Sequence, residues 1–241
     1  MKPEPPTIAF DRFIRLEWIS EALKVRAGQI DQSQLEQFLD NAGLGREARI
    51  KTRTKLKVLC LEPRGELKEF MDRGISFAQS ASSVETQLIF AWGAVVANYP
   101  FFSKVAELVG RLSSIQGDCA GSEIHRRMSE QYGERHNVKV ATRAVIQTLV
   151  DWSVVRRQED ENRLIPIDKR TLSTAEPSLW LVESIVRATN KPVSLESINS
   201  NPLVFPFSFD LPLAYLVANS DTLELRMEGA NQQIVDLRRS N

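Results

Sequence analysis

The hydrophobic pattern between residues 101 and 168 predicts three helices followed by a two-stranded hairpin. In the first helix, apolar positions recur about every 3.6 residues after Phe101 and the pattern stops at Gly117. After a polar turn, a second helix opens at Gly121 or Ser122 and closes at Gly133, a residue suited to a left-handed cap. We expect the core-facing residues of these two helices to be Val105, Leu108, Val109, Leu112, Ile115, Ile124 and Met128.

The third helix begins near Asn137 and separates apolar from basic positions. Lys139, Arg143 and Gln147 recur every four residues and therefore project together from one side. Residues 135–150 include no acidic side chain. The residues expected on the opposite, core-facing side are Val138, Ala141, Val145 and Leu149.

Two short runs, 154–157 and 163–167, flank the polar tip 159–162 and predict a β-hairpin. Three helices followed by such a hairpin are typical of a winged helix. In that fold the third helix enters the major groove of DNA and the hairpin, or wing, lies against a neighbouring phosphate strand. We therefore expect DNA contacts from Lys139, Thr142, Arg143 and Gln147 on the helix and from Arg156, Arg157 and Arg163 on the wing.

The first hundred residues predict a bundle of five helices. Gly28 and Gly43 end the first two, and Asp31 is a good N-cap for the second. The third, 46–61, is the most basic element, and Pro63 ends it and can begin the fourth. We expect an accessory phosphate patch on the third helix, with a merely solvated helix face as the alternative. The residues of this patch are Arg49, Arg53 and Lys57.

The uncharged stretch 86–103 approaches the length of a membrane-spanning helix. Its useful apolar run covers only residues 88–97, and Pro100 follows. We interpret it as a buried helix that ends at Tyr99, in a protein without membrane contact. The aromatic residues expected in the core at this junction, in preference to a base-stacking platform, are Trp92, Tyr99, Phe101 and Phe102.

Behind the hairpin, residues 172–177 suggest a linker to a smaller module of helices and strands. An amphipathic helix around Trp180 ends at Asn190. Short helices are expected at 194–198 and 212–219, joined by the uncharged loop 199–209. Alternating runs at 222–227 and 233–237 predict an antiparallel hairpin. The order repeats that of residues 101–168, which suggests a second, degenerate winged helix.

The expected fold is therefore mostly α, in three parts. An N-terminal helical bundle spans residues 1–100, a winged-helix domain spans 101–170, and a C-terminal degenerate winged-helix-like α+β module spans 171–241. The chain has 31 Lys and Arg against 31 Asp and Glu, so it lacks the overall basic excess of many DNA-binding proteins. Any nucleic-acid binding must therefore depend on local patches.

The candidate chemistry indicates no enzyme. His125 and His136 are the only histidines, and both are expected as surface helix residues. Glu123 and His125 project about 200 degrees apart on one helix, so they cannot hold a metal together. Phosphate loops, dinucleotide-binding glycines, nucleophile elbows and zinc-protease pairs are missing from the sequence. We expect no cofactor and no metal.

Two further features favour the cytoplasm. Cys60 and Cys119 are far apart in the sequence and are expected as reduced thiols. The first six residues are polar and proline-rich, where a signal peptide requires an apolar core.

The layout resembles the BrxA family of BREX phage-defence systems over residues 10–157. The resemblance lies in the basic third helix at 48–56, the apolar helix that runs into 99–102, and the helix end at 149–155. It implies a cytoplasmic, non-enzymatic protein that binds double-stranded DNA beside other defence proteins. The region from Leu172 onward has no counterpart in this resemblance.

A different function remains open from the sequence. The chain could be a protein-interaction subunit of a larger assembly that uses the same folds to dock partners. The apolar segment 204–209 would be its docking surface. A nuclease would require an acidic metal-binding cluster, which the sequence does not suggest.

Overall fold

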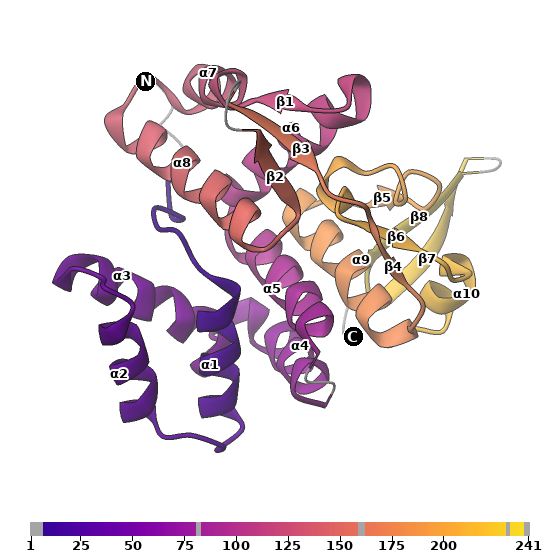
Figure 1. Cartoon of the computed structure of the whole chain (residues 1–241). Helices are drawn as coiled ribbons and strands as arrows, with labels where there is room; N and C mark the ends of the chain where they lie inside the picture. The colour runs from indigo at the N-terminus through magenta and orange to yellow at the C-terminus, as the bar shows by residue number, and fades with distance from the viewer. Residues whose placement is uncertain (1–6, 81–82, 159–161, 230–231, 239–241) are drawn as a thin grey trace, which may run out of the picture.

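The computed structural model describes residues 7–80, 83–158, 162–229 and 232–238, which are mostly helical (Figure 1). In Figure 1, α1 to α3 (residues 16–56) lie on one side of the central α5 (Val84–Asn98), while α9 (Ala175–Thr189) and the strands that follow it lie on the other side. The helices α6 to α8 and a small sheet complete the molecule. The described strands form one two-stranded and two three-stranded sheets.

All five helices expected in the N-terminal part are present. A π-helical turn, Lys57–Leu61, extends the third helix, and a 3-10 turn, Gly65–Leu67, leads into the fourth. Asp31 caps the second helix as predicted, because its side chain and that of Gln34 satisfy each other's backbone N–H groups. The helices are α1 Leu16–Arg26, α2 Gln32–Asn41, α3 Arg46–Leu56, α4 Lys68–Ser80 and α5 Val84–Asn98.

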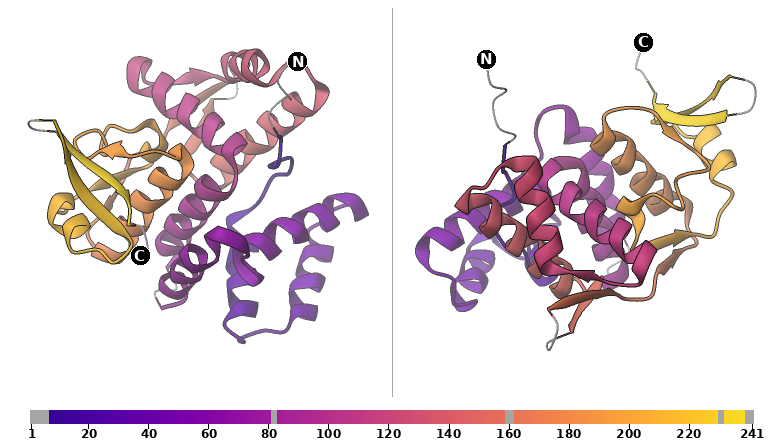
Figure 2. Two further views of the ribbon diagram at one scale, coloured as in Figure 1. Left: turned by 180° about the vertical axis from the view of Figure 1, so that it is seen from behind. Right: turned by 90° about the horizontal axis from the view of Figure 1, so that it is seen from above.

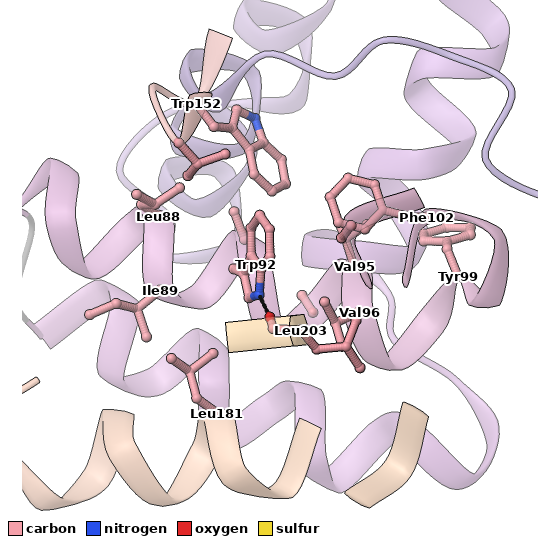
Figure 3. Packing of buried hydrophobic residues seen from close by; sticks show 14 of the residues in the cluster. Leu88, Ile89, Trp92, Val95, Val96, Tyr99, Phe102, Trp152, Leu181 and Leu203 are labelled. Carbon is pink, nitrogen blue, oxygen red and sulfur yellow. Dashed lines mark hydrogen bonds between the residues drawn. The ribbon is translucent and has the colours of Figure 1, made fainter. Parts of the chain in front are cut away.

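The uncharged stretch forms a buried helix, as predicted. Helix α5 ends before Tyr99, and α6 (Pro100–Gln116) starts at the proline with a bend of 116°. The indole N–H of Trp92 donates to the carbonyl of Leu203 at 2.9 Å inside the core (Figure 3). The aromatic residues that prove to be buried, and so cannot stack on bases, are Trp92, Tyr99, Phe101 and Phe102.

No single helix in the described ranges has both the length and the apolar character needed to cross a membrane. The bent pair α5 and α6 meets that criterion only when the two helices are taken together.

The elements expected between residues 101 and 168 are present, together with one that the sequence did not indicate. In chain order they are α6, β1 (Cys119–Ala120), α7 (Gly121–Tyr132), α8 (His136–Asp151), β2 (Val155–Gln158) and β3 (Arg163–Pro166). The unexpected element is β1, which occupies the predicted polar turn and pairs with β3. The antiparallel sheet therefore has the order β1-β3-β2.

Two details of these helices differ from expectation. Ile115 is 77% exposed, because it lies in the last turn of α6, beyond the elements that cover Leu112. Gly133 has a positive φ of 86° but a ψ of 155°, so it is not a left-handed helical cap. The other core-facing residues predicted for α6 and α7 are buried.

The C-terminal part contains more strand than predicted. The expected linker at 172–177 contains the end of one strand and the beginning of a helix. The short helix expected at 194–198 is wrong, because this segment begins in a strand that pairs with β8 and continues in turns. The elements are β4 Arg170–Leu172, α9 Ala175–Thr189, β5 Val193–Ser194, a 3-10 turn Pro202–Val204, β6 Phe207–Phe209, α10 Leu213–Ala218, β7 Leu223–Glu228 and β8 Gln232–Leu237.

The apolar half of the segment expected as a loop at 199–209 is buried. It contains β6, which pairs in parallel with β4. Val204, Phe205, Phe207 and Phe209 are each at most 9% exposed. The proposal that residues 204–209 dock a partner is therefore wrong.

The predicted C-terminal hairpin is confirmed by the antiparallel register of β7 and β8, from Leu223 opposite Leu237 to Glu228 opposite Gln232. Leu223 and Leu225 pack inward, but Met227 is 60% exposed. The hairpin projects from the body of the protein (Figures 1 and 2), which leaves its far half without a covering layer.

Helix α9 joins the N-terminal and C-terminal parts. The indole of Trp180 stacks on Phe70 of α4, with ring centres 4.5 Å apart, and donates a hydrogen bond to the Phe70 carbonyl at 2.9 Å. Three residues further on, the buried carboxylate of Glu183 binds Arg73 of α4 and Thr222 beside β7. One continuous hydrophobic core thus extends through all three predicted domains.

Candidate nucleic-acid interface

Helix α8 has a buried face and a basic exposed face. Val138, Ala141, Val145 and Leu149 are fully buried, which confirms the predicted core-facing side. Lys139, Arg143 and Gln147 are exposed on the other side of the helix. The exposed face therefore carries two cations and one amide, all available to a ligand.

Thr142 is not part of that face. It is fully buried, and its hydroxyl donates to the carbonyl of Val138 at 2.8 Å. Thr142 lies one turn after Val138 and so shares its inward direction. The predicted groove contact from Thr142 is therefore wrong.

The three arginines predicted for the wing have different surroundings. Arg157 is paired with the buried Leu164 across the β2–β3 ladder, so it is on the face of the hairpin turned toward the helices. Arg156 alternates to the other face and is exposed. Arg163 binds the carboxylate of Asp118, and this hydrogen-bonded pair holds the pKa of Asp118 below its usual value.

Of the polar tip expected at 159–162, residues 159–161 lie outside the described residues. Asn162, just before β3, has a positive φ of 49°. Its carbonyl accepts a hydrogen bond from the backbone N–H of Gly121 at 3.1 Å. A Cβ atom at Gly121 would lie 3.3 Å from the Asn162 amide nitrogen, so glycine allows α7 to approach the hairpin closely.

A hollow of about 590 Å³ lies where α7, α8 and the hairpin meet. Arg143 and Gln147 reach it from α8, and Arg157 reaches it from β2. None of the described residues that line it is acidic. Its lining is Gly121, Ser122, His125, Arg143, Ile146, Gln147, Arg157, Asn162 and Leu164.

His125 lies between this hollow and a second one of about 360 Å³, which Lys139 also lines. Burial lowers the pKa of His125, and the nearby Arg143 and Lys139 lower it further. His125 is half-buried, so it is not the simple surface residue that the sequence suggested, whereas His136 is exposed. Sequence spacing could not find this residue, since the groups around it come from other elements.

The accessory patch on the third helix faces carboxylates. Arg49 binds Asp40, and Arg53 binds Glu36 at 2.7 Å. Lys57 lies 3.1 Å from Glu62. These acids come from α2 and from the chain after α3, so the charge of the helix taken alone overstates its attraction for phosphate. The accessory patch stays a prediction.

The remaining candidate chemistry is sparse in the part of the chain that the structure describes. No group of three or more His, Cys, Asp or Glu residues there could hold a metal ion. Cys60 and Cys119 are buried free thiols, and burial raises the pKa of both. Comparison of the chain with protein-family models, curated proteins and solved structures found no match.

Proposed function

We propose that this protein is a non-enzymatic, double-stranded DNA-binding protein whose winged helix consists of α6, β1, α7, α8, β2 and β3. The order of helices and strands, and a sheet in which β3 lies between β1 and β2, support this fold. Helix α8 would be the recognition helix and the β2–β3 hairpin the wing.

The observation that carries the proposal is the hollow between α8 and β2, into which both elements project cations. Arg143 and Arg157 face a common space, and no described acidic residue lines it. A backbone phosphate is the ligand that such a pair of guanidinium groups recognises. With the hairpin at a phosphate, Lys139, Arg143 and Gln147 would face the adjacent groove.

We also propose a second, degenerate winged helix formed by α9, β5, α10, β7 and β8. Its sheet order, β5-β8-β7, matches that of the first sheet, with the strand after the first helix paired to the last strand of the hairpin. Turns replace its second helix. Arg226 on its hairpin binds Glu224 and Asp236, so this module would contribute little to DNA affinity.

The proposed setting is the cytoplasm of a prokaryotic cell, as an accessory component of a phage-defence system. This setting rests on the resemblance to BrxA proteins described above. Efficiency of phage plating tests it: deletion of the gene should raise plating in a host that carries the rest of the system. Equal plating with and without the gene would contradict the role in defence.

The DNA-binding proposal is tested by the salt dependence of binding to a labelled duplex. Replacing Lys139 and Arg143 together with Ala should weaken binding and lower the slope of log affinity against log salt by about one for each phosphate contact that is lost. The matched control replaces Arg49 and Arg53, which removes the same charge from residues that already have carboxylate partners.

The control should lose much less affinity than the Lys139 and Arg143 variant, because carboxylates already offset the charges of Arg49 and Arg53, and circular dichroism should show that both variants remain folded. If the Lys139 and Arg143 variant binds like wild type, α8 is not the DNA-facing element. If the control loses as much affinity as this variant, the third helix is part of the interface after all.

A further inference from the structure

His125 lies beside the hollow that Arg143 and Arg157 line at the proposed interface. Its ring reaches two adjoining hollows on the side of α7 that faces α8. Ser122, one turn earlier on α7, lines both hollows as well, and Arg143 and Gln147 line the larger one. An anion that bridges Arg143 and Arg157 in the larger hollow would therefore lie against the imidazole.

The charges around His125 are mainly positive. Lys139 and Arg143 face it from α8, and Arg157 lines the same hollow from β2. On its own helix the charged neighbours at the smaller hollow are Arg126 and Glu130, which bind each other. Glu134, in the turn after α7, also lines the smaller hollow.

In the unliganded protein this environment keeps the imidazole neutral at neutral pH, because burial and two cations oppose a third positive charge. A bound phosphate reverses the balance, since its negative charge offsets the cations and its oxygens accept hydrogen bonds from a protonated ring. Phosphate binding and proton uptake by His125 are then linked.

We propose that the larger hollow holds one backbone phosphate of duplex DNA, that protonated His125 contacts this phosphate, and that DNA binding therefore strengthens as the pH falls. This inference rests on the proposed DNA binding. Because the bound form takes up a proton, affinity rises as the pH falls through the pKa of His125 in the complex. The affinity levels off once the pH is below the pKa of His125 in the free protein, which is the lower of the two. One proton can change the affinity by at most about tenfold per pH unit within that window.

The chain has two histidines, so a variant of one can serve as the control for a variant of the other. Affinity for a labelled duplex is measured at constant ionic strength from about pH 5.5 to about pH 8 for wild type, His125→Gln and His136→Gln. The His136→Gln variant is the matched control, since it removes the only other histidine of the chain. Wild type and His136→Gln should gain affinity toward acid pH, while His125→Gln should still bind in a salt-sensitive way but with a flat pH profile.

The outcomes separate this inference from the proposal beneath it. If wild type shows no salt-sensitive binding at any pH, the DNA-binding function fails. If wild type binds with the expected salt slope but its pH profile matches that of His125→Gln, or if only His136→Gln flattens the profile, the role of His125 is overturned.

A second arm distinguishes DNA phosphate from free phosphate. The NMR signal of the His125 ring, assigned by comparison with His125→Gln, is titrated against pH alone, with duplex DNA, and with inorganic phosphate. A pKa of His125 raised by the duplex more than by inorganic phosphate at equal phosphate concentration supports the backbone contact. A shift with inorganic phosphate and none with DNA would overturn it.

Discussion

At the scale of single residues, Gly93 determines how closely α9 can approach α5. A Cβ atom there would lie 2.2 Å from a ring carbon of Trp180, which is far inside van der Waals contact. Trp180 is held on its other side by Phe70, so the indole has no room to retreat. We expect Gly93→Ala to lower the free energy of unfolding by about 1–3 kcal/mol, measured by urea denaturation.

A double-mutant cycle tests whether the clash with the Trp180 indole causes the cost of Gly93→Ala. Trp180→Ala alone should cost about 3–5 kcal/mol as a large core deletion. In that background Gly93→Ala should cost nothing further, because the atoms that the methyl group meets are gone. An undiminished cost in the Trp180→Ala background would show that the indole is not the reason for glycine at this position.

Residue-level prediction from the sequence succeeded where the helical period alone decides the outcome. The period placed Lys139, Arg143 and Gln147 on the exposed face of α8 and the apolar residues in the core. It failed at Thr142 because a polar side chain can be buried by satisfying its hydroxyl on its own helix. It failed at His125 because the cations around that ring come from elements that only the fold brings together.

At the scale of elements, hydrogen bonds join the N-terminal segment before α1 to the end of α8. The backbone N–H of Ile14 donates to the Thr148 hydroxyl at 3.1 Å, and the Trp152 indole donates to the Ile14 carbonyl at 3.0 Å. Asp151 accepts a hydrogen bond from the backbone N–H of Leu16, the first residue of α1, at 3.0 Å. The proposed recognition helix is thus fixed to the N-terminal bundle at its far end.

The contribution of Asp151 to stability at this junction depends on pH in a predictable way. Asp151 is exposed overall, but partial desolvation of its carboxylate raises its pKa above the ordinary value of 3.8 and outweighs the opposing effect of the hydrogen bond from Leu16. The folded protein then holds the proton more tightly than the unfolded chain, so this group's contribution to stability falls as the pH rises from the ordinary value through the raised one. Asp151→Asn keeps an oxygen acceptor for Leu16 and carries no charge to be partly desolvated.

We therefore expect Asp151→Asn to be at least as stable as wild type at neutral pH and to lack the fall in stability across that interval. Urea unfolding between about pH 4 and about pH 7 measures both quantities. If the variant is less stable than wild type at neutral pH, the carboxylate charge at the first turn of α1 matters more than its partial desolvation.

Elements were predictable from the sequence in proportion to their length. The long helices and both hairpins contain enough periodic apolar positions to be predicted from the sequence. The strands β1 and β5 have two residues each, and both form only because a partner strand lies beside them. Strand β4 lies at the start of a segment that looked like a linker, and it pairs with a β6 that is distant in sequence. No local pattern reports such pairing.

At the scale of the whole molecule, the sequence suggested a separate C-terminal module behind a linker at 172–177, whereas the packing of α9 ties this region to the N-terminal bundle. Trp180 is 3% exposed and contacts aromatic rings of both α4 and α5. Glu183 on the same helix is bound by Arg73 of α4, by Arg187 and by Thr222. Helix α9 therefore completes the core of the N-terminal bundle while it carries the C-terminal hairpin.

A chain truncated after Thr174 should accordingly fail to fold cooperatively, even though it keeps every residue of the proposed DNA interface. Removing α9 exposes the apolar slot that Trp180 fills, and the loss exceeds that of a single large core deletion, about 3–5 kcal/mol, within a typical stability of about 5–15 kcal/mol. Thermal unfolding followed by circular dichroism should show one sharp transition for the full chain and none for the truncated one. Adding residues 175–241 as a separate fragment should restore both the transition and duplex binding, because the missing helix supplies contacts and not a covalent constraint. A truncated chain that unfolds sharply and binds DNA with the affinity of the full chain would show that the bundle and the proposed first winged helix fold independently of α9.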